Sequence, residues 1–128
     1  MMKLKNKNLL INKCYVNGTW ISSNKKIKVI NPATGELIVE VPDFGKKETA
    51  NAIDAAEHAF KTWSKFTAHE RSKILKKWYD LVIDNQDDLA TIMTAEQGKP
   101  LSEAKGEIIY AANFIEWFAE EEIGRAHV

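Results

Sequence analysis

The sequence contains few of the residues that commonly carry catalysis. A single cysteine, Cys14, rules out both a disulfide within the chain and a cysteine-based zinc site. A reactive thiol needs a base or a positive environment, and Cys14 follows Lys13 at the start of an expected strand, so we interpret it as structural. The three histidines, His58, His69 and His127, are scattered along the chain without the spacing of metal ligands. The sequence therefore predicts no metal site.

Excess charge, long apolar runs and a phosphate-binding loop are missing as well. The 18 basic and 18 acidic residues cancel, which argues against a nucleic-acid-binding protein. The apolar segment 9–11 is too short for a signal peptide or a membrane span. Because there is no Gly-x-Gly-x-x-Gly motif, dinucleotide binding cannot be argued from a fingerprint. We expect a soluble, cytoplasmic protein that binds neither nucleic acid nor a membrane.

Residues 15–41 have the pattern of a small antiparallel β element that follows a partly ordered arm, residues 1–12. Asn17-Gly18 is a strong hairpin signal, and Asn31-Pro32-Ala33-Thr34-Gly35 has the composition of a turn. An element of this size needs a helix or another sheet to cover it. The strands expected here are 15–16, 19–21, 28–30 and 36–41, the last ended by Pro42.

From Lys46 the apolar period changes to that of helices, and four helices are expected between about 46 and 122. Thr67-Ala68-His69-Glu70 fits a capping box at the start of the second helix, and Asp84–Asp88 caps the third. Gly98 should end the third helix and Pro100 should begin the fourth. The apolar faces expected to be buried in the first three helices are Ala50, Ile53, Ala56, Phe60 and Trp63; Ile74, Leu75, Trp78, Leu81 and Val82; and Leu89, Ile92 and Met93.

The last helix, from Leu101 to about Glu122, carries two apolar stripes about 110° apart at ~100° per residue. In a small monomer, both stripes would belong to the core. In a larger protein, one stripe could face a partner domain or a ligand tunnel. The stripes are Ala104, Ile108, Ala111, Ile115 and Phe118, and Tyr110, Phe114 and Trp117.

Three acidic residues are candidates for chemistry. Glu96 could act as a general base, but it lies in the last turn of a helix close to Lys99, and no second positioned group accompanies it. Glu103 and Glu107 are one turn apart and could bind a cation, although a solvated acidic face is the simpler interpretation. The residues alone indicate an α/β domain with an unusually apolar last helix.

The order of several short motifs resembles the N-terminal part of an aldehyde dehydrogenase. Each motif is weak alone, but five of them follow the order and spacing of the family. The resemblance covers about residues 10–122, and residues 108–121 look most similar to the succinate-semialdehyde dehydrogenase branch. The motifs are Tyr15-Val16-Asn17-Gly18-Thr19-Trp20; Asn31-Pro32-Ala33-Thr34-Gly35-Glu36; Ala55-Ala56-Glu57-His58-Ala59-Phe60 with Trp63; Glu70-Arg71 with Leu75; and Glu96-Gln97-Gly98-Lys99-Pro100.

The resemblance implies oxidation of an aldehyde to the carboxylic acid with NAD or NADP, in an enzyme that forms a homo-oligomer at full length. It also implies a cysteine nucleophile and a glutamate base that lie beyond this chain, so neither Cys14 nor Glu96 takes these roles, and no catalytic or cofactor-binding residue is assigned here. Succinate semialdehyde is the implied substrate. Another semialdehyde, an amino aldehyde, or a non-catalytic helical module that binds a partner remain alternatives.

The resemblance further implies that residues 1–128 are the N-terminal portion of the cofactor-binding domain, about a quarter of the enzyme, without most of its parallel sheet. We expect this short chain to be inactive. Residues 123–128 depart from the family pattern and read like a translated sequencing adapter, so we expect a non-native tail and a reading frame that continues. In the family, the helix after the Glu-Gln-Gly-Lys motif lines the mouth of the substrate tunnel. Tyr110 and Phe114 are therefore the candidate tunnel residues, with Trp117 a weaker one.

Overall fold

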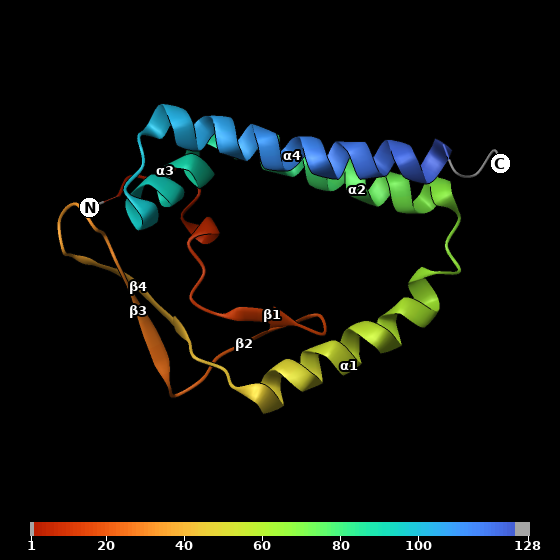
Figure 1. Cartoon of the computed structure of the whole chain (residues 1–128), viewed down its shortest axis with the longest axis horizontal. Coiled ribbons are helices and arrows are strands. Elements are labelled where there is room, and N and C mark those ends of the chain that lie inside the picture. The colour runs from red at the N-terminus through yellow and green to blue at the C-terminus, as the bar shows by residue number, and fades with distance from the viewer. Residues whose placement is uncertain (1, 125–128) are drawn as a thin grey trace.

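The computed structural model describes residues 2–124 as a β region followed by four helices, which confirms the predicted fold class. Two separate antiparallel hairpins, β1–β2 and β3–β4, form the β region, and every pairing among the described strands is antiparallel. The elements are η1 (Lys7–Leu9), β1 (Cys14–Val16), β2 (Thr19–Ile21), β3 (Lys26–Ile30), β4 (Leu37–Pro42), α1 (Lys46–Trp63), α2 (Ala68–Asp84), α3 (Gln86–Gln97) and α4 (Leu101–Gly124) (Figure 1).

The first hairpin follows from its turn residues. Asn17 and Gly18 both have positive φ angles, 49° and 76°, as a type I′ turn requires. This turn sets the register in which Val16 pairs with Thr19. Across the strands, the rings of Tyr15 and Trp20 lie 5.0 Å apart between centroids, which adds a cross-strand contact. The predicted hairpin is confirmed.

The second hairpin is closed by the turn 31–35. The Asn31 carbonyl accepts a hydrogen bond from the Gly35 N–H at 2.8 Å, and the Asn31 side chain accepts one from the Ala33 N–H at 2.9 Å. Gly35 takes a positive φ of 71°, which glycine adopts without a steric penalty. The third strand begins two residues earlier than predicted, because Lys26 pairs with Pro42 at the far end of β4.

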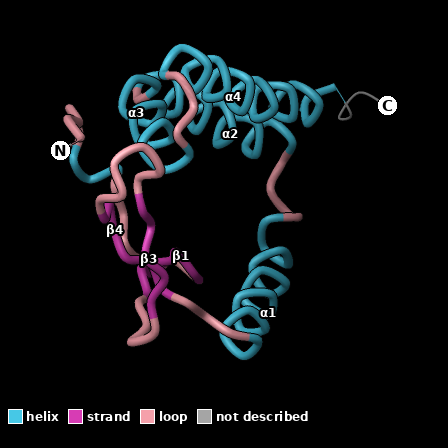
Figure 2. Tube along the Cα trace, turned by 60° about the vertical axis from the view of Figure 1, so that its left-hand side comes forward, coloured by secondary structure: helices cyan, strands magenta, loops and turns pink. Residues whose placement is uncertain are grey.

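Helices α2 and α4 lie side by side and antiparallel, with α3 against the first half of α4 (Figures 1 and 2). Helix α1 stands apart from these three in both views. The core of the helical layer is small: Ala90, Ala104 and Ile108 are buried, and the residues packed around them are Val82, Leu89 and Met93.

The buried stripe of α4 differs from the predicted one. The buried residues are Ala104, Ile108, Ala112 and Ala119, whereas Phe118 is 59% exposed and Ala111 is also exposed. Small alanines at the contact allow α2 and α4 to approach closely, and a phenylalanine there would hold the helices apart. The predicted stripe is therefore confirmed at Ala104 and Ile108 and wrong at Ala111 and Phe118, where the next residue along the chain is buried instead.

The predicted apolar faces of α1 and α2 are also largely uncovered. On α1, Ile53 and Phe60 are 62% and 63% exposed. On α2, Ile74, Trp78 and Leu81 are about half exposed, and Ser72 is the buried residue of the helix instead. Periodicity shows that a face is apolar, but it does not show that its covering partner lies in the same segment.

Gly98 ends α3 as predicted and brings α3 against the turn of the second hairpin. Its φ of 82° is left-handed, and its N–H donates to the Thr94 carbonyl at 2.9 Å. The carbonyl of Pro100 then accepts from the Ala104 N–H at 3.0 Å as α4 begins. A Cβ atom on Gly98 would lie 2.9 Å from Cγ of Pro32. Position 98 therefore needs glycine for two reasons: the backbone is left-handed, and a Cβ atom would be too close to Pro32.

Gly98→Ala should lower the free energy of unfolding by about 1–3 kcal/mol from the backbone alone, with a further loss from the contact with Pro32. Gly35→Ala is the matched control, because Gly35 also has a positive φ but nothing lies within 4 Å of its Cβ position. The measurement is the urea unfolding midpoint of each variant in the full-length protein. Equal losses for the two variants would show that the approach of Pro32 costs nothing.

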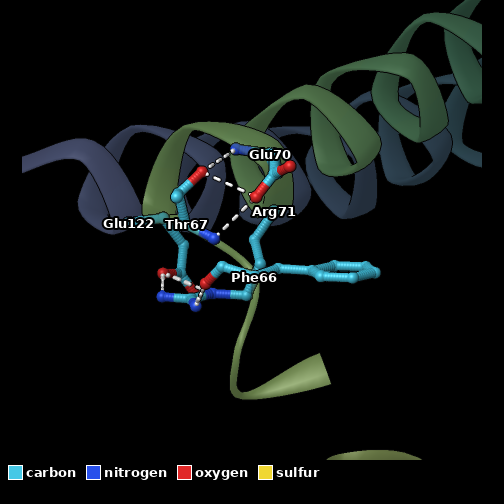
Figure 3. Close-up of polar contacts among 5 residues, drawn as sticks. All are labelled: Phe66, Thr67, Glu70, Arg71 and Glu122. Carbon is cyan, nitrogen blue, oxygen red and sulfur yellow. Dashed lines mark hydrogen bonds and ion pairs between the residues drawn. The ribbon is translucent and has the colours of Figure 1, made fainter. Parts of the chain in front are cut away.

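The capping box of α2 is also present as predicted (Figure 3). The Thr67 hydroxyl oxygen accepts from the Glu70 N–H at 3.2 Å, and the Glu70 carboxylate accepts from the Thr67 N–H at 2.8 Å. The hydrogen bond from the Thr67 backbone, with a second from its hydroxyl, lowers the pKa of Glu70 below its ordinary value of 4.5. The ionised form of Glu70 therefore stabilises the start of the helix.

This lowered pKa predicts a pH dependence. The stabilisation should be complete above pH 4.5, the ordinary pKa, and lost as the pH falls through the lower pKa of the folded state. Compared with Glu70→Gln, the natural protein should have the higher unfolding midpoint at neutral pH, and the difference should close in acid. Glu57→Gln, an exposed position on α1, should show no such difference. A Glu70→Gln difference that is the same at neutral and acidic pH would contradict the prediction.

Candidate functional site

Helix α4 carries an uncovered aromatic face made of Tyr110, Phe114 and Trp117. These side chains are 65%, 50% and 63% exposed, and they lie on the side of α4 that faces away from α2 and α3. Tyr110 and Phe114 contact each other edge to face, with ring centroids 5.0 Å apart and an interplanar angle of 89°. One turn of helix separates them, so together they present a continuous apolar surface.

The exposure of the aromatic face excludes one interpretation of the α4 stripes, a core that lies within residues 2–124. If both stripes belonged to a core within residues 2–124, these rings would be buried, and they are not. Exposed aromatic clusters of this kind are typical of surfaces that contact another part of the protein, a partner protein or a ligand. The interpretation that remains is a face directed at something outside the described residues.

The acidic residues proposed as candidates beside this face make contacts that stabilise the fold. Glu107 forms an ion pair with Lys99, whose side chain is only 15% exposed. Glu103 lies in the first turn of α4, where a negative charge stabilises the helix N-terminus. Within residues 2–124, no group of three histidine, cysteine, aspartate or glutamate side chains could hold a metal ion. Glu96 lies in the last turn of α3, as the sequence predicts.

The remaining candidates are far apart in the fold. Cys14 is a free, half-buried cysteine at the start of β1, paired with Ile21 of the neighbouring strand. His58 lies on α1 and His69 in the first turn of α2. His127 lies outside the described residues. The structure therefore brings none of these described side chains to the aromatic face.

Arg71 fixes the end of α4 relative to α2 (Figure 3). Its guanidinium donates to the Glu122 carboxylate at 2.6 and 3.0 Å and to the Phe66 carbonyl. The hydrogen bonds to Glu122 raise the pKa of Arg71 further above its ordinary value. This contact joins residues 51 positions apart and was missed in the sequence, where no local pattern could reveal it.

A hollow lies between α3 and the turn of the second hairpin. It has a volume of about 580 Å³ and lies against Gly98 at the α3–α4 junction. Its lining is mixed, with Asn31 and Thr34 from the turn and Thr94 from α3. The Thr94 hydroxyl is buried and makes no hydrogen bond among the described residues.

No helix within residues 2–124 is long and apolar enough to cross a membrane.

Comparison with known proteins identifies the fold that carries these features. The sequence model of the Aldehyde dehydrogenase family matches residues 20–126. The chain belongs to this family. Among relatives, it is 57% identical over 122 residues to the glutarate-semialdehyde dehydrogenase of Pseudomonas putida and 53% identical to the NADP-dependent succinate-semialdehyde dehydrogenase of Escherichia coli. Each alignment covers 94% of this chain and 25% of the relative.

Solved aldehyde dehydrogenase structures agree with this assignment. An aldehyde dehydrogenase from Brucella melitensis superposes with a TM-score of 0.92 at 54% identity, over 94% of this chain and 26% of that one. The succinate-semialdehyde dehydrogenase from Burkholderia pseudomallei gives 0.89 at 54% identity, over 92% and 25%. The chain thus spans about a quarter of the length of the curated relatives it matches. The predicted family and fold are confirmed, and the glutarate and succinate enzymes are similarly close.

Proposed function

We propose that this chain is the N-terminal portion of the cofactor-binding domain of an NAD(P)-dependent dehydrogenase for a short semialdehyde that ends in a carboxylate. The enzyme would oxidise succinate or glutarate semialdehyde to the dicarboxylic acid. The observation that carries the proposal is the identity of 53–57% to enzymes for these two aldehydes over nearly the whole chain. We further propose that residues 123–128 are a non-native tail, of which 125–128 lie outside the described residues.

The part proposed for this chain is scaffold and tunnel wall. Tyr110 and Phe114 would contact the carbon chain of the aldehyde through their rings, selecting by shape and apolar contact without taking part in proton or hydride transfer. A bound nicotinamide would accept the hydride. The sequence offers no Gly-rich phosphate loop and no residue with the chemistry of a nucleophile beside the aromatic face, so we assign neither cofactor binding nor catalysis to this chain.

Other aldehydes and a non-catalytic role are the alternatives to this proposal. The 3-sulfolactaldehyde dehydrogenase of Pseudomonas putida is 46% identical, so relatives of this similarity act on more than one anionic aldehyde. An amino aldehyde is the alternative of opposite charge. The exposed aromatic face also fits a non-catalytic helical module that binds a partner. A complete reading frame that encodes a cysteine nucleophile and a cofactor-binding loop would argue against the last alternative.

The test is reduction of NAD and NADP by the full-length protein with succinate semialdehyde, glutarate semialdehyde and an amino aldehyde. We expect turnover with one or both carboxylated aldehydes and a much higher KM for the amino aldehyde. Turnover with the amino aldehyde alone would overturn the substrate class, and turnover with none would favour the binding module. Light scattering on the same preparation tests the expected homo-oligomer, and sequencing through codon 128 tests the tail.

A further inference from the structure

The N-terminal arm is held by a buried carboxylate at the start of α3. Asp88 is only 6% exposed, and its two oxygens accept hydrogen bonds from the backbone N–H groups of Lys5 and Asn6, at 2.9 and 2.7 Å. More than eighty residues separate the partners along the chain. The arm was predicted to be only partly ordered. Instead, it forms the short helical turn η1 and is docked at this point.

The neighbouring aspartate extends the contact to α4. Asp87 binds the Lys5 ammonium at 3.2 Å and the Lys105 ammonium at 2.7 Å. The hydrogen bond from Lys105, followed by that from Lys5, lowers the pKa of Asp87. Two consecutive acids therefore join the arm, the first turn of α3 and the first half of α4.

Burial makes Asp88 different from an ordinary first-turn acid. A carboxylate removed from water is costly unless hydrogen bonds compensate it, and charge-assisted bonds to backbone N–H groups are among the stronger ones. An acid that served only the α3 N-terminus could do so while exposed to water. At Asp88, the arm both covers the carboxylate and supplies the two compensating donors.

The docked arm also forms one wall of the 580 Å³ hollow. Met2 and Leu10, one from each end of the arm, line it together with Asn31 and Thr94. Between them, the Asn6 side chain accepts from the Asn8 N–H at 3.1 Å and so shapes the turn η1. Displacing the arm would remove these two side chains from the lining of the hollow between α3 and the second hairpin.

We propose that residues 2–10 are a strap, latched by Asp88, that lines one side of the open hollow beside α3 and detaches when the latch is broken. The strap is a conformational element of the N-terminal region and is separate from the aromatic face of α4. Its defining contact is the pair of hydrogen bonds from Lys5 and Asn6 to Asp88.

Hydrogen–deuterium exchange of the full-length protein tests the latch. In the natural protein, peptides covering residues 2–10 should be protected. Asp88→Asn leaves one amide oxygen for two N–H donors. Lys5→Pro removes the backbone donor to Asp88, together with the ammonium that binds Asp87, and leaves the sequence of α3 unchanged. Each should raise exchange in the arm by about tenfold or more, as expected when a hydrogen bond to a charged group is lost. Trypsin should also cut faster after Lys3 and Lys7.

The control is Asp84→Asn, the same chemical change at an exposed position near the end of α2, which should leave exchange in the arm unchanged. If Asp88→Asn fails to fold, Lys5→Pro decides the question alone. An arm that exchanges at the rate of a free peptide in the natural protein would overturn the proposal. So would faster exchange in α3 after Asp88→Asn together with no effect of Lys5→Pro, because Asp88 would then serve the helix only.

Discussion

Phe114→Ala in the full-length enzyme should raise KM for its aldehyde by about tenfold or more while leaving kcat within a small factor. Burying a phenylalanine side chain contributes about 1.5–3 kcal/mol, and 1.4 kcal/mol corresponds to a factor of ten in affinity. Because the ring is proposed to contact the carbon chain away from the reacting carbonyl, its loss weakens binding in the ground state and the transition state alike. Tyr110→Ala should have the same sign, since the two rings contact each other.

Phe60→Ala provides the control for these kinetics. Phe60 is 63% exposed on α1, comparable with Phe114 at 50%, but lies on a helix that stands apart from α4 (Figure 1). It should leave KM unchanged. If Phe114→Ala lowers the unfolding midpoint and leaves KM at the natural value, the ring packs against protein in the full-length enzyme, and the proposed tunnel wall is wrong.

Residues 1–128 expressed alone should associate and show no dehydrogenase turnover. Their core is small, and exposed aromatic side chains lie on three different helices: Phe60 on α1, Trp78 on α2, and Tyr110, Phe114, Trp117 and Phe118 on α4. Contiguous apolar patches of more than several hundred Å² promote association. Helix α1 stands apart from the other helices (Figure 2), so it has little apolar cover to hold it in place.

Size-exclusion chromatography with light scattering, combined with near-ultraviolet circular dichroism, measures this outcome. We expect oligomers of mixed size, weak aromatic dichroism and a broad thermal transition. The full-length protein, measured in parallel, should give one species and a sharp transition. A monomeric short chain with a cooperative melt would contradict the prediction, and turnover by it would overturn the assignment of catalysis to residues outside this chain.

Local turn and cap chemistry was readable from sequence. The hairpin at Asn17-Gly18, the capping box of Thr67 and Glu70, and the helix end at Gly98 all form as predicted. Each depends on residues within four positions of one another and on backbone angles that few residue types adopt. Such features are decided before any tertiary contact forms, so one sequence is enough to predict them.

Burial was predicted less well, because it depends on partners distant in the chain. Phe118 and Trp78 were assigned to buried faces and are exposed, while Ala112 of α4 and Ser72 of α2 are buried. An apolar stripe is equally consistent with a contact inside or outside the segment. The sequence predicted two apolar stripes on the last helix. It did not show which of the two stripes is buried, and the structure shows that Tyr110, Phe114 and Trp117 are exposed.

The contact between Arg71 and Glu122 sets a time scale for synthesis on the ribosome. The arginine of α2 is translated 51 residues before its carboxylate partner on α4. At about 5–20 residues per second, α2 waits roughly 3–10 seconds before the helix that covers it has been made. During that interval the nascent chain presents the uncovered side of α2 to the surrounding solution. Slow codons between 72 and 122 would lengthen this exposure.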